Sequence, residues 1–299
     1  MKKIGMIGLD TSHVTIFAEL LSNQDHEHYI GGGEVIAGWP GGSKDFAMSH
    51  SRVDEYTNAL RDQYGATIFE TPEEVAEVSD AIFIHAVDGA THLELFKQVV
   101  SYGKPVFIDK PLACSVHDAK AIIELAEERE VLIGSASSLR YWDELVIAIA
   151  DKEMGEIESM EAWGPLSFQE GMPWYFWYGV HSVEMLVAGL GPGCEEMSLH
   201  MNDKSEILNM RWADGRSGIY HGIKEGHGGF GAVIHRSEGV QVLDCAKSSR
   251  PYYVSLVERL MDTLVQGKEM VAYDEMLETV KILEWGCRMK DEKNSRLTV

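Results

Sequence analysis

KKIGMIGLDTSHV (residues 2–14) is the stretch that decides the fold of the N-terminal half. Ile4–Gly8 is a short apolar run typical of a buried strand, and Val14–Leu21 repeats apolar residues at helical spacing. Gly8 ends the first run and opens the turn, where the first βα turn of a dinucleotide-binding domain needs a glycine for its tight bend. This stretch predicts a strand, a turn and a helix that open a Rossmann-type nucleotide-binding domain.

The turn departs from the G-x-G-x-x-G pattern, because Asp10 and His13 stand in the second and third glycine places. A carboxylate about 4 Å from a phosphate would cost roughly 1 to 4 kcal/mol, depending on the local dielectric. Two interpretations stay open for this turn. One of Asp10, Thr11 and Ser12 caps the following helix, or the turn contacts the cofactor through Gly8, Asp10, Thr11, Ser12 and His13.

Strand and helix patterns alternate up to residue 139, which predicts right-handed crossovers and a doubly wound parallel sheet. Thr71 and Pro72 are the cap and first-turn residue of a predicted helix, and Val116–Glu128 has strong helical spacing. Residues 1–139 are therefore expected to form the Rossmann domain.

The pattern of residues 140–299 is different and predicts an α+β domain with an antiparallel sheet. Short strand-like runs follow one another closely and are separated by turns such as Ala213-Asp214-Gly215. The chain then returns to helix, first over Tyr253–Gln266 and, after Gly267, over Tyr273–Lys290.

Composition limits the partners. The 299 residues carry 48 acidic against 26 basic side chains, a formal charge of −22, which disfavours nucleic acid as a partner. No apolar run is long enough to span a bilayer, so no membrane association is expected. The four cysteines are widely spaced without a Cys-x-x-Cys pair, which favours free thiols and a cytoplasmic location.

Val35–Gly38 is the second predicted strand, and the loop after it is Trp39-Pro40-Gly41-Gly42-Ser43-Lys44. This loop lacks the acidic residue that binds an adenosine ribose in NAD-specific sites. Ser43 and Lys44 there favour, faintly, a 2′-phosphate and hence NADP over NAD. The alternative is a flexible surface loop.

Asp109-Lys110-Pro111 follows a predicted parallel strand, at the sheet edge where open α/β sheets bind ligands. A lysine there can hydrogen-bond a substrate hydroxyl and assist proton transfer. Taken alone, Lys110 is more typical of a surface lysine.

The chain resembles the glucose–fructose oxidoreductase and inositol dehydrogenase family (Gfo/Idh/MocA). His92-Leu93-Glu94 and Gly103 through Leu112 are similar to its His-x-Glu and Gly-Lys-x-Val…Glu-Lys-Pro-Leu motifs, with Asp109 for the usual Glu. Further similar segments are Arg140-Tyr141, Gly155-Glu156-Ile157, Gly179 through Leu186, and Gly267 through Val280. The likeness runs in order along nearly the whole chain.

The resemblance implies NAD or NADP as cofactor, a sugar, polyol or related hydroxy compound as substrate, and a homo-oligomer, dimer or tetramer. It implies a catalytic pair, Lys110 and His181, in which His181 removes or returns the hydroxyl proton. It also implies that residues 140–299 form an open antiparallel sheet, bind substrate and mediate oligomerisation. We expect substrate contacts at Arg140, Trp177 and Tyr178. We expect cofactor contacts at Trp39, Asp88, His92, Asp109 and Pro111, in addition to the turn and loop described above.

Three departures motivate an alternative, a non-catalytic ligand-binding or regulatory homologue. Asp10 and His13 replace glycines, and Trp177 stands where the family usually has Asp. The rings of Pro173 through Tyr178 either stack on a sugar or pack against the sheet or a neighbouring subunit.

No metal site is expected. Asp25-His26-Glu27-His28 and the three histidines at 221, 227 and 235 lack the spacing of a closed zinc site.

Overall fold

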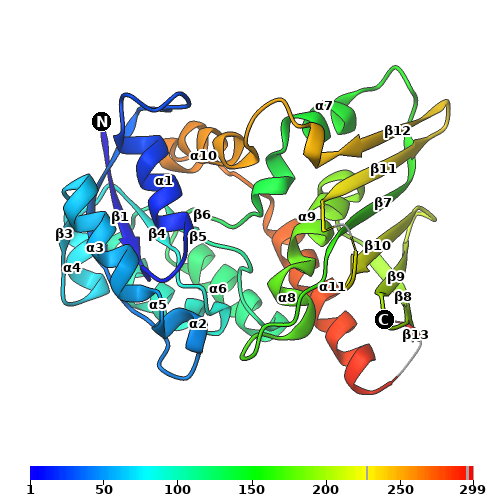
Figure 1. The fold of residues 1–299 in the computed structure, drawn as a ribbon, viewed down its shortest axis with the longest axis horizontal. Coiled ribbons are helices and arrows are strands. Elements are labelled where there is room, and N and C mark those ends of the chain that lie inside the picture. Colours follow the sequence, from blue (N-terminus) through cyan, green and yellow to red (C-terminus); the bar gives the residue numbers. More distant parts are fainter. Residues whose placement is uncertain (227, 294–295, 299) are drawn as a thin grey trace. The chain divides into compact units, whose positions relative to one another are not determined.

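The computed structural model describes residues 1–226, 228–293 and 296–298. His227, one of the histidines considered above, lies outside the described residues. The chain divides into two compact units, the first formed by residues 1–136 and 256–272 and the second by residues 137–255 and 273–299. Each unit is built around one sheet (Figure 1).

The first unit contains a six-stranded sheet in the order β3-β2-β1-β4-β5-β6, the strand order of a dinucleotide-binding Rossmann domain. All its strand pairs are parallel, as the strand–helix alternation predicts. The strands are β1 (Lys2–Ile7), β2 (Gly33–Trp39), β3 (Thr67–Ile68), β4 (Ala81–Ile84), β5 (Val106–Ile108) and β6 (Ile133–Gly134).

The crossover helices of this unit follow their sequence signals closely. Thr71 caps α4 through a capping box with Glu74, and the predicted helix over Val116–Glu128 is α6 with the same bounds. The sequence did not indicate α3, because Leu60 is its only buried residue and it therefore has no apolar stripe. The helices are α1 (His13–Ser22), α2 (Ala47–His50), α3 (Val53–Tyr64), α4 (Pro72–Val78), α5 (His92–Val99) and α6 (Val116–Glu128).

Residues 256–272 pack with this first unit, although the sequence divides the chain once, after residue 139. They include most of α10 (Tyr252–Asp262). Met261 lies against Gly33, and Met270 lies against Gly134. The absence of side chains at these two glycines makes room for the returning segment.

The second unit contains a seven-stranded sheet in the order β12-β11-β7-β10-β9-β8-β13. Most pairs are antiparallel, as predicted, but β7 and β10 are parallel. Because β7 and β10 are far apart in sequence, no hairpin joins them and none dictates their direction. The strands are β7 (Ile157–Pro165), β8 (Cys194–Met201), β9 (Ser205–Trp212), β10 (Ser217–Ile223), β11 (Gly231–Arg236), β12 (Gly239–Asp244) and β13 (Arg296–Thr298).

One helix, α9, covers this sheet along β7 and is in turn covered by α11. Gly189 of α9 lies against Met160 and Gly164 of β7 against Ser182, so helix and strand approach closely. The helices of this unit are α7 (Asp143–Ala150), α8 (Trp174–Trp177), α9 (Gly179–Leu190) and α11 (Tyr273–Asp291). Among the described helices, none combines the length and the apolar character needed to cross a bilayer.

Candidate functional site

The turn after β1 brings two strand ends into close contact. Gly8 has φ +82°, and a Cβ there would lie 2.5 Å from the backbone nitrogen of Ala86. Only glycine fits this position, which is the role of the first glycine in a dinucleotide turn.

Asp10 faces into the protein. Its side chain is 1% exposed and accepts hydrogen bonds from the Val87 amide at 2.8 Å and from the Ser49 hydroxyl at 2.5 Å. Burial raises the pKa of Asp10, although both hydrogen bonds oppose the shift. The carboxylate is therefore bound by the loop after β4 and by α2.

The capping interpretation of this turn is not confirmed. Ser12 is the residue before α1, and its side chain makes no capping hydrogen bond within the described structure. Because Asp10 is held by Val87 and Ser49, the first turn of α1 has no carboxylate cap from it. The start of α1 thus keeps the arrangement that suits a phosphate: backbone donors at a helix N-terminus.

The loop after β2 is tied to the loop after β4. The Ser43 hydroxyl donates to Asp88 Oδ2 at 2.8 Å, and the Trp39 indole donates to the Glu70 carbonyl. Ser43 is thereby engaged with a carboxylate, while Lys44 is exposed. The lean toward NADP is not confirmed.

His92, at the start of α5, is fully buried and joins two strand ends. Its Nε2 lies 2.7 Å from the Ala86 carbonyl oxygen and its Nδ1 lies 2.9 Å from that of Pro111. His92 fixes the loops that follow β4 and β5, and its predicted contact with the cofactor stays a prediction.

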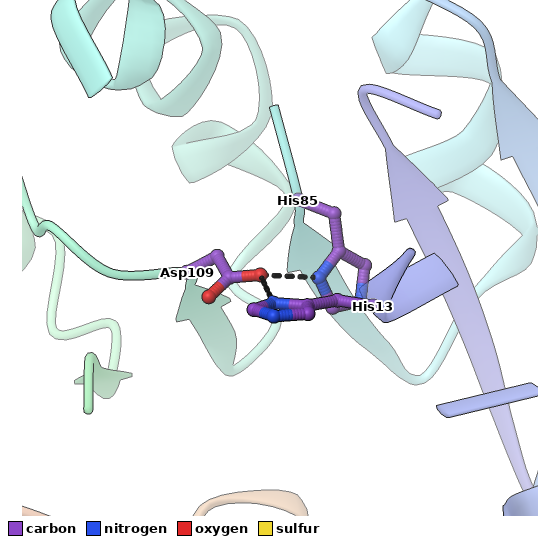
Figure 2. Close-up of side chains that lie close together, drawn as sticks. All are labelled: His13, His85 and Asp109. Carbon is purple, nitrogen blue, oxygen red and sulfur yellow. Dashed lines mark hydrogen bonds and ion pairs between the residues drawn. The ribbon is translucent and has the colours of Figure 1, made fainter. Parts of the chain in front are cut away.

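Asp109 is the centre of a buried cluster (Figure 2). Its Oδ2 lies 2.5 Å from His13 Nδ1 and 3.0 Å from His85 Nδ1, and its Oδ1 accepts the Lys110 amide at 2.8 Å. Burial alone would raise the pKa of Asp109, but the two imidazoles outweigh it and hold that pKa well below its usual range. Burial lowers the pKa of the neighbouring Lys110, partly offset by the Asp109 carboxylate.

Sequence reasoning selected His13 and Asp109 as cofactor contacts and did not single out His85. The signal was available, since His85 directly follows β4 as Asp109 directly follows β5. Neighbouring parallel strands end at the same edge of a sheet, so both positions share one neighbourhood.

In the second unit, the side chain of Ser137 holds that of His181. The Ser137 Oγ lies 2.7 Å from His181 Nδ1 and also accepts the Leu139 amide at 3.1 Å. The ring of His181 lies beside those of Tyr178 and Phe230, at centroid distances of 6.0 and 5.5 Å. These contacts orient the imidazole from three sides.

The predicted substrate residues of this unit have packing partners. Tyr178 stacks on Phe230 and meets Trp177 edge to face. Arg140 is buried, forms an ion pair with Glu275, and lies 3.5 Å from Glu184. Burial raises the pKa of Glu184 to about 7, although Arg140 lowers it.

Known structures share this fold over nearly the whole chain. The crystal structure of GenD2 from gentamicin A biosynthesis, in complex with NAD, superimposes with a TM-score of 0.77 at 17% identity, covering 100% of this chain and 96% of that one. Scyllo-inositol dehydrogenase from Lactobacillus casei gives 0.79 at 15% identity, covering 100% and 98%. Myo-inositol dehydrogenase from the same organism, in complex with NAD(H) and myo-inositol, gives 0.76 at 14% identity, covering 100% and 97%.

The sequence itself matches a known family over its first domain. No curated protein matches the sequence. Residues 3–137 match the oxidoreductase family described by its NAD-binding Rossmann fold. This match concerns the first domain, and residues 138–299 lie outside it.

Proposed function

We propose that this protein is an NAD-dependent oxidoreductase that transfers a hydride to or from a carbon bearing a hydroxyl group in a polyol or sugar-like compound. The observation that carries the proposal is the orientation of Asp10. Its carboxylate is bound by Val87 and Ser49, which removes the main objection to a pyrophosphate at the start of α1. The residues of the turn therefore fit the cofactor of the family.

The chemistry requires one proton and one hydride to leave the substrate alcohol. Bound NAD supplies the hydride acceptor at its nicotinamide ring. By likeness to the family, His181 accepts the hydroxyl proton and Lys110 hydrogen-bonds the same oxygen. An imidazole suits this task because its ordinary pKa lies near neutrality. Because the Ser137 hydroxyl contacts Nδ1 of His181, we assign the proton transfer to Nε2.

The loop after β2 supports NAD over NADP. Residues at the end of this strand hold the adenosine ribose in Rossmann domains. Here the Ser43 hydroxyl donates to Asp88 Oδ2, so the residue expected to hold a 2′-phosphate is already bound to a carboxylate. The negative charges of the Asp88 carboxylate and of a 2′-phosphate would repel each other.

A polyol substrate is supported by the relatives and by the aromatic residues. Two of the similar structures are inositol dehydrogenases, and one of them is in complex with myo-inositol. The rings of Trp177 and Tyr178 can pack against the C–H faces of a cyclic polyol.

The test begins with binding and then turns to turnover. NADH fluorescence should change on titration with the protein, and a panel of inositols, sugars and sugar acids should include a compound that reduces NAD. Lys110→Ala and His181→Ala should abolish turnover while NADH still binds. Absence of NADH binding at millimolar concentrations would refute the proposal. Binding without turnover of any compound would favour the non-catalytic homologue.

Cofactor preference has its own control. NADPH should bind more weakly than NADH, and Asp88→Asn should strengthen NADPH binding several-fold because it removes one negative charge. NADH affinity should change little in the same variant. Equal affinities of the unaltered protein for the two cofactors would contradict the assignment to NAD.

A further inference from the structure

Three side chains with metal-binding chemistry meet at the edge of the first sheet. His13 opens α1 after β1, His85 follows β4, and Asp109 follows β5. These strands are adjacent, and β1 and β4 flank the point where the strand order reverses. Open α/β sheets bind their ligands at the carboxyl ends of strands at such a point.

We infer that His13, His85 and Asp109 bind a divalent transition-metal ion, with Zn²⁺ as the representative of the class. The side chains' candidate ligand atoms all lie within 4.8 Å of one another. Their residues are 7%, 0% and 4% exposed, so the cluster is shielded from water. Two imidazoles and one carboxylate form the ligand set of many catalytic zinc and non-haem iron sites.

The carboxylate is oriented for this role. Its Oδ1 is occupied by the Lys110 amide at 2.8 Å, so Oδ2 is the oxygen that faces the two imidazoles. A hydrogen bond to the second oxygen of a ligating carboxylate is the usual outer contact of a metal site. Figure 2 shows both rings converging on this one oxygen.

The surroundings of His85 provide an independent argument. Its Nε2 is buried and has no hydrogen-bond partner among the described residues. Phe17, Phe83 and Phe107 surround the ring in edge-to-face contacts, with the Phe17 centroid at 4.8 Å. Phenyl rings cannot donate a hydrogen bond to a bare nitrogen, but they accept a weak N–H···π contact.

A neutral His85 ring can carry its proton on Nε2, for which the described residues offer no hydrogen-bond partner. The neutral ring then presents a lone pair from Nδ1 toward Asp109 Oδ2, 3.0 Å away. Two lone pairs at this distance repel unless a cation lies between them. A metal ion supplies that cation. If Nδ1 of His85 instead donates a hydrogen bond to Asp109, the Nε2 lone pair of the neutral ring has no hydrogen-bond donor.

The ligand set also indicates the kind of ion. The cluster offers two nitrogens and carboxylate oxygens but no sulfur, which suits Zn²⁺, Fe²⁺ or Co²⁺ rather than a soft ion such as Cu⁺. Three protein ligands leave a coordination position for water or for an oxygen of a small ligand. The inference concerns binding, and it holds whether or not the proposed dehydrogenase activity is found.

The test uses the full-length protein without an affinity tag, freed of metal by a chelator and then dialysed. Co²⁺ is the probe, since its visible absorption reports coordination geometry. We expect one Co²⁺ per chain with a four- or five-coordinate spectrum, displaced by Zn²⁺. Asp109→Asn and His13→Gln should each weaken binding by at least about 100-fold, more than the loss of an outer-shell contact.

The matched control is His117→Gln, which removes an exposed histidine that also lies 3.0 Å from a carboxylate, that of Asp118. This variant should bind Co²⁺ like the unaltered protein. Absence of stoichiometric binding would overturn the inference and leave a hydrogen-bonded triad. Equal binding by Asp109→Asn, His13→Gln and His117→Gln would overturn it too, since the ion would then lie elsewhere. The two cluster variants are independent, so one that fails to fold leaves the other as the test.

The dinucleotide titration is repeated on the metal-free protein to separate the two proposals. NADH binding without Co²⁺ binding refutes the metal site alone. Co²⁺ binding at the cluster without NADH binding refutes the proposed function alone.

Discussion

Asp10 Oδ1 accepts a hydrogen bond of 2.8 Å from the Val87 amide, so the residue in the second glycine place contacts the loop after β4. An acidic residue in this turn is therefore compatible with a Rossmann site when the fold supplies donors that hold its side chain. Ser49 supplies the second donor from α2.

Asp10→Asn is expected to change NADH affinity by less than about threefold. An asparagine can accept from Val87 and donate to Ser49, so the turn keeps its shape while the charge is lost. A carboxylate 4 Å from the pyrophosphate would instead make the substitution tighten binding by about fivefold to 1000-fold. NADH fluorescence titration separates these results, and a large gain in affinity would show that Asp10 faces the cofactor.

Gly8→Ala is expected to lower the free energy of unfolding by about 2 to 5 kcal/mol, from backbone strain together with overpacking. The new Cβ would meet the Ala86 backbone nitrogen at 2.5 Å, at a φ of +82°.

The control is Gly65→Ala, since Gly65 has φ +70° but no atom within 4 Å of a built Cβ. Gly65→Ala should lower the free energy of unfolding by only about 1 to 2 kcal/mol, from backbone strain alone. Urea unfolding measures both variants. Equal losses would mean that Ala86 moves away freely and that the close approach is unimportant.

Ser137→Ala is expected to lower kcat about tenfold and to shift its pH profile, while NADH still binds. The substitution removes the hydroxyl 2.7 Å from His181 Nδ1, so the imidazole loses a hydrogen-bond partner and a contact that orients it.

Ser182→Ala is the companion variant, because Ser182 lies beside His181 in sequence and its buried hydroxyl has no partner among the described residues. Its pH profile should match that of the unaltered protein. Identical shifts in the two variants would point to a general packing effect rather than to positioning of His181.

The unaltered protein is expected to lose stability as the pH rises from about 4.5 to 7, and Glu184→Gln is expected to remove this loss. The pKa of Glu184 is raised from 4.5 to about 7 because burial disfavours its charged form, more strongly than Arg140 favours it. A carboxyl with a raised pKa contributes stability below pH 4.5, and this contribution is lost as the pH rises through 7.

Urea unfolding at several pH values measures this effect as the difference between the unaltered protein and Glu184→Gln. That difference should change between about pH 4.5 and 7 and be constant outside this window. A constant difference at every pH would show that Glu184 titrates normally beside Arg140 and Glu275.

Local pattern was sufficient for most of the elements. The apolar runs at β1 and β4, the capping box at Thr71 and the spacing of α6 are all short-range signals, and each element formed where its signal lies. The sequence did not predict the polar helix α3, because Leu60 is its only buried residue. The sequence did not predict the parallel pairing of β7 and β10, because pairing between strands distant in sequence has no local signature.

The sequence by itself determined the class of the first domain, the first glycine of its turn and the strand-end position of Asp109-Lys110, since each depends on neighbours in the chain. Tertiary structure alone decided where Asp10 points and that His85 joins His13 and Asp109. Those contacts join residues 77, 24 and 96 positions apart. Only the packing of adjacent strands fixes such distances, because side-chain direction at a strand end depends on the donors and rings that the neighbouring loops supply.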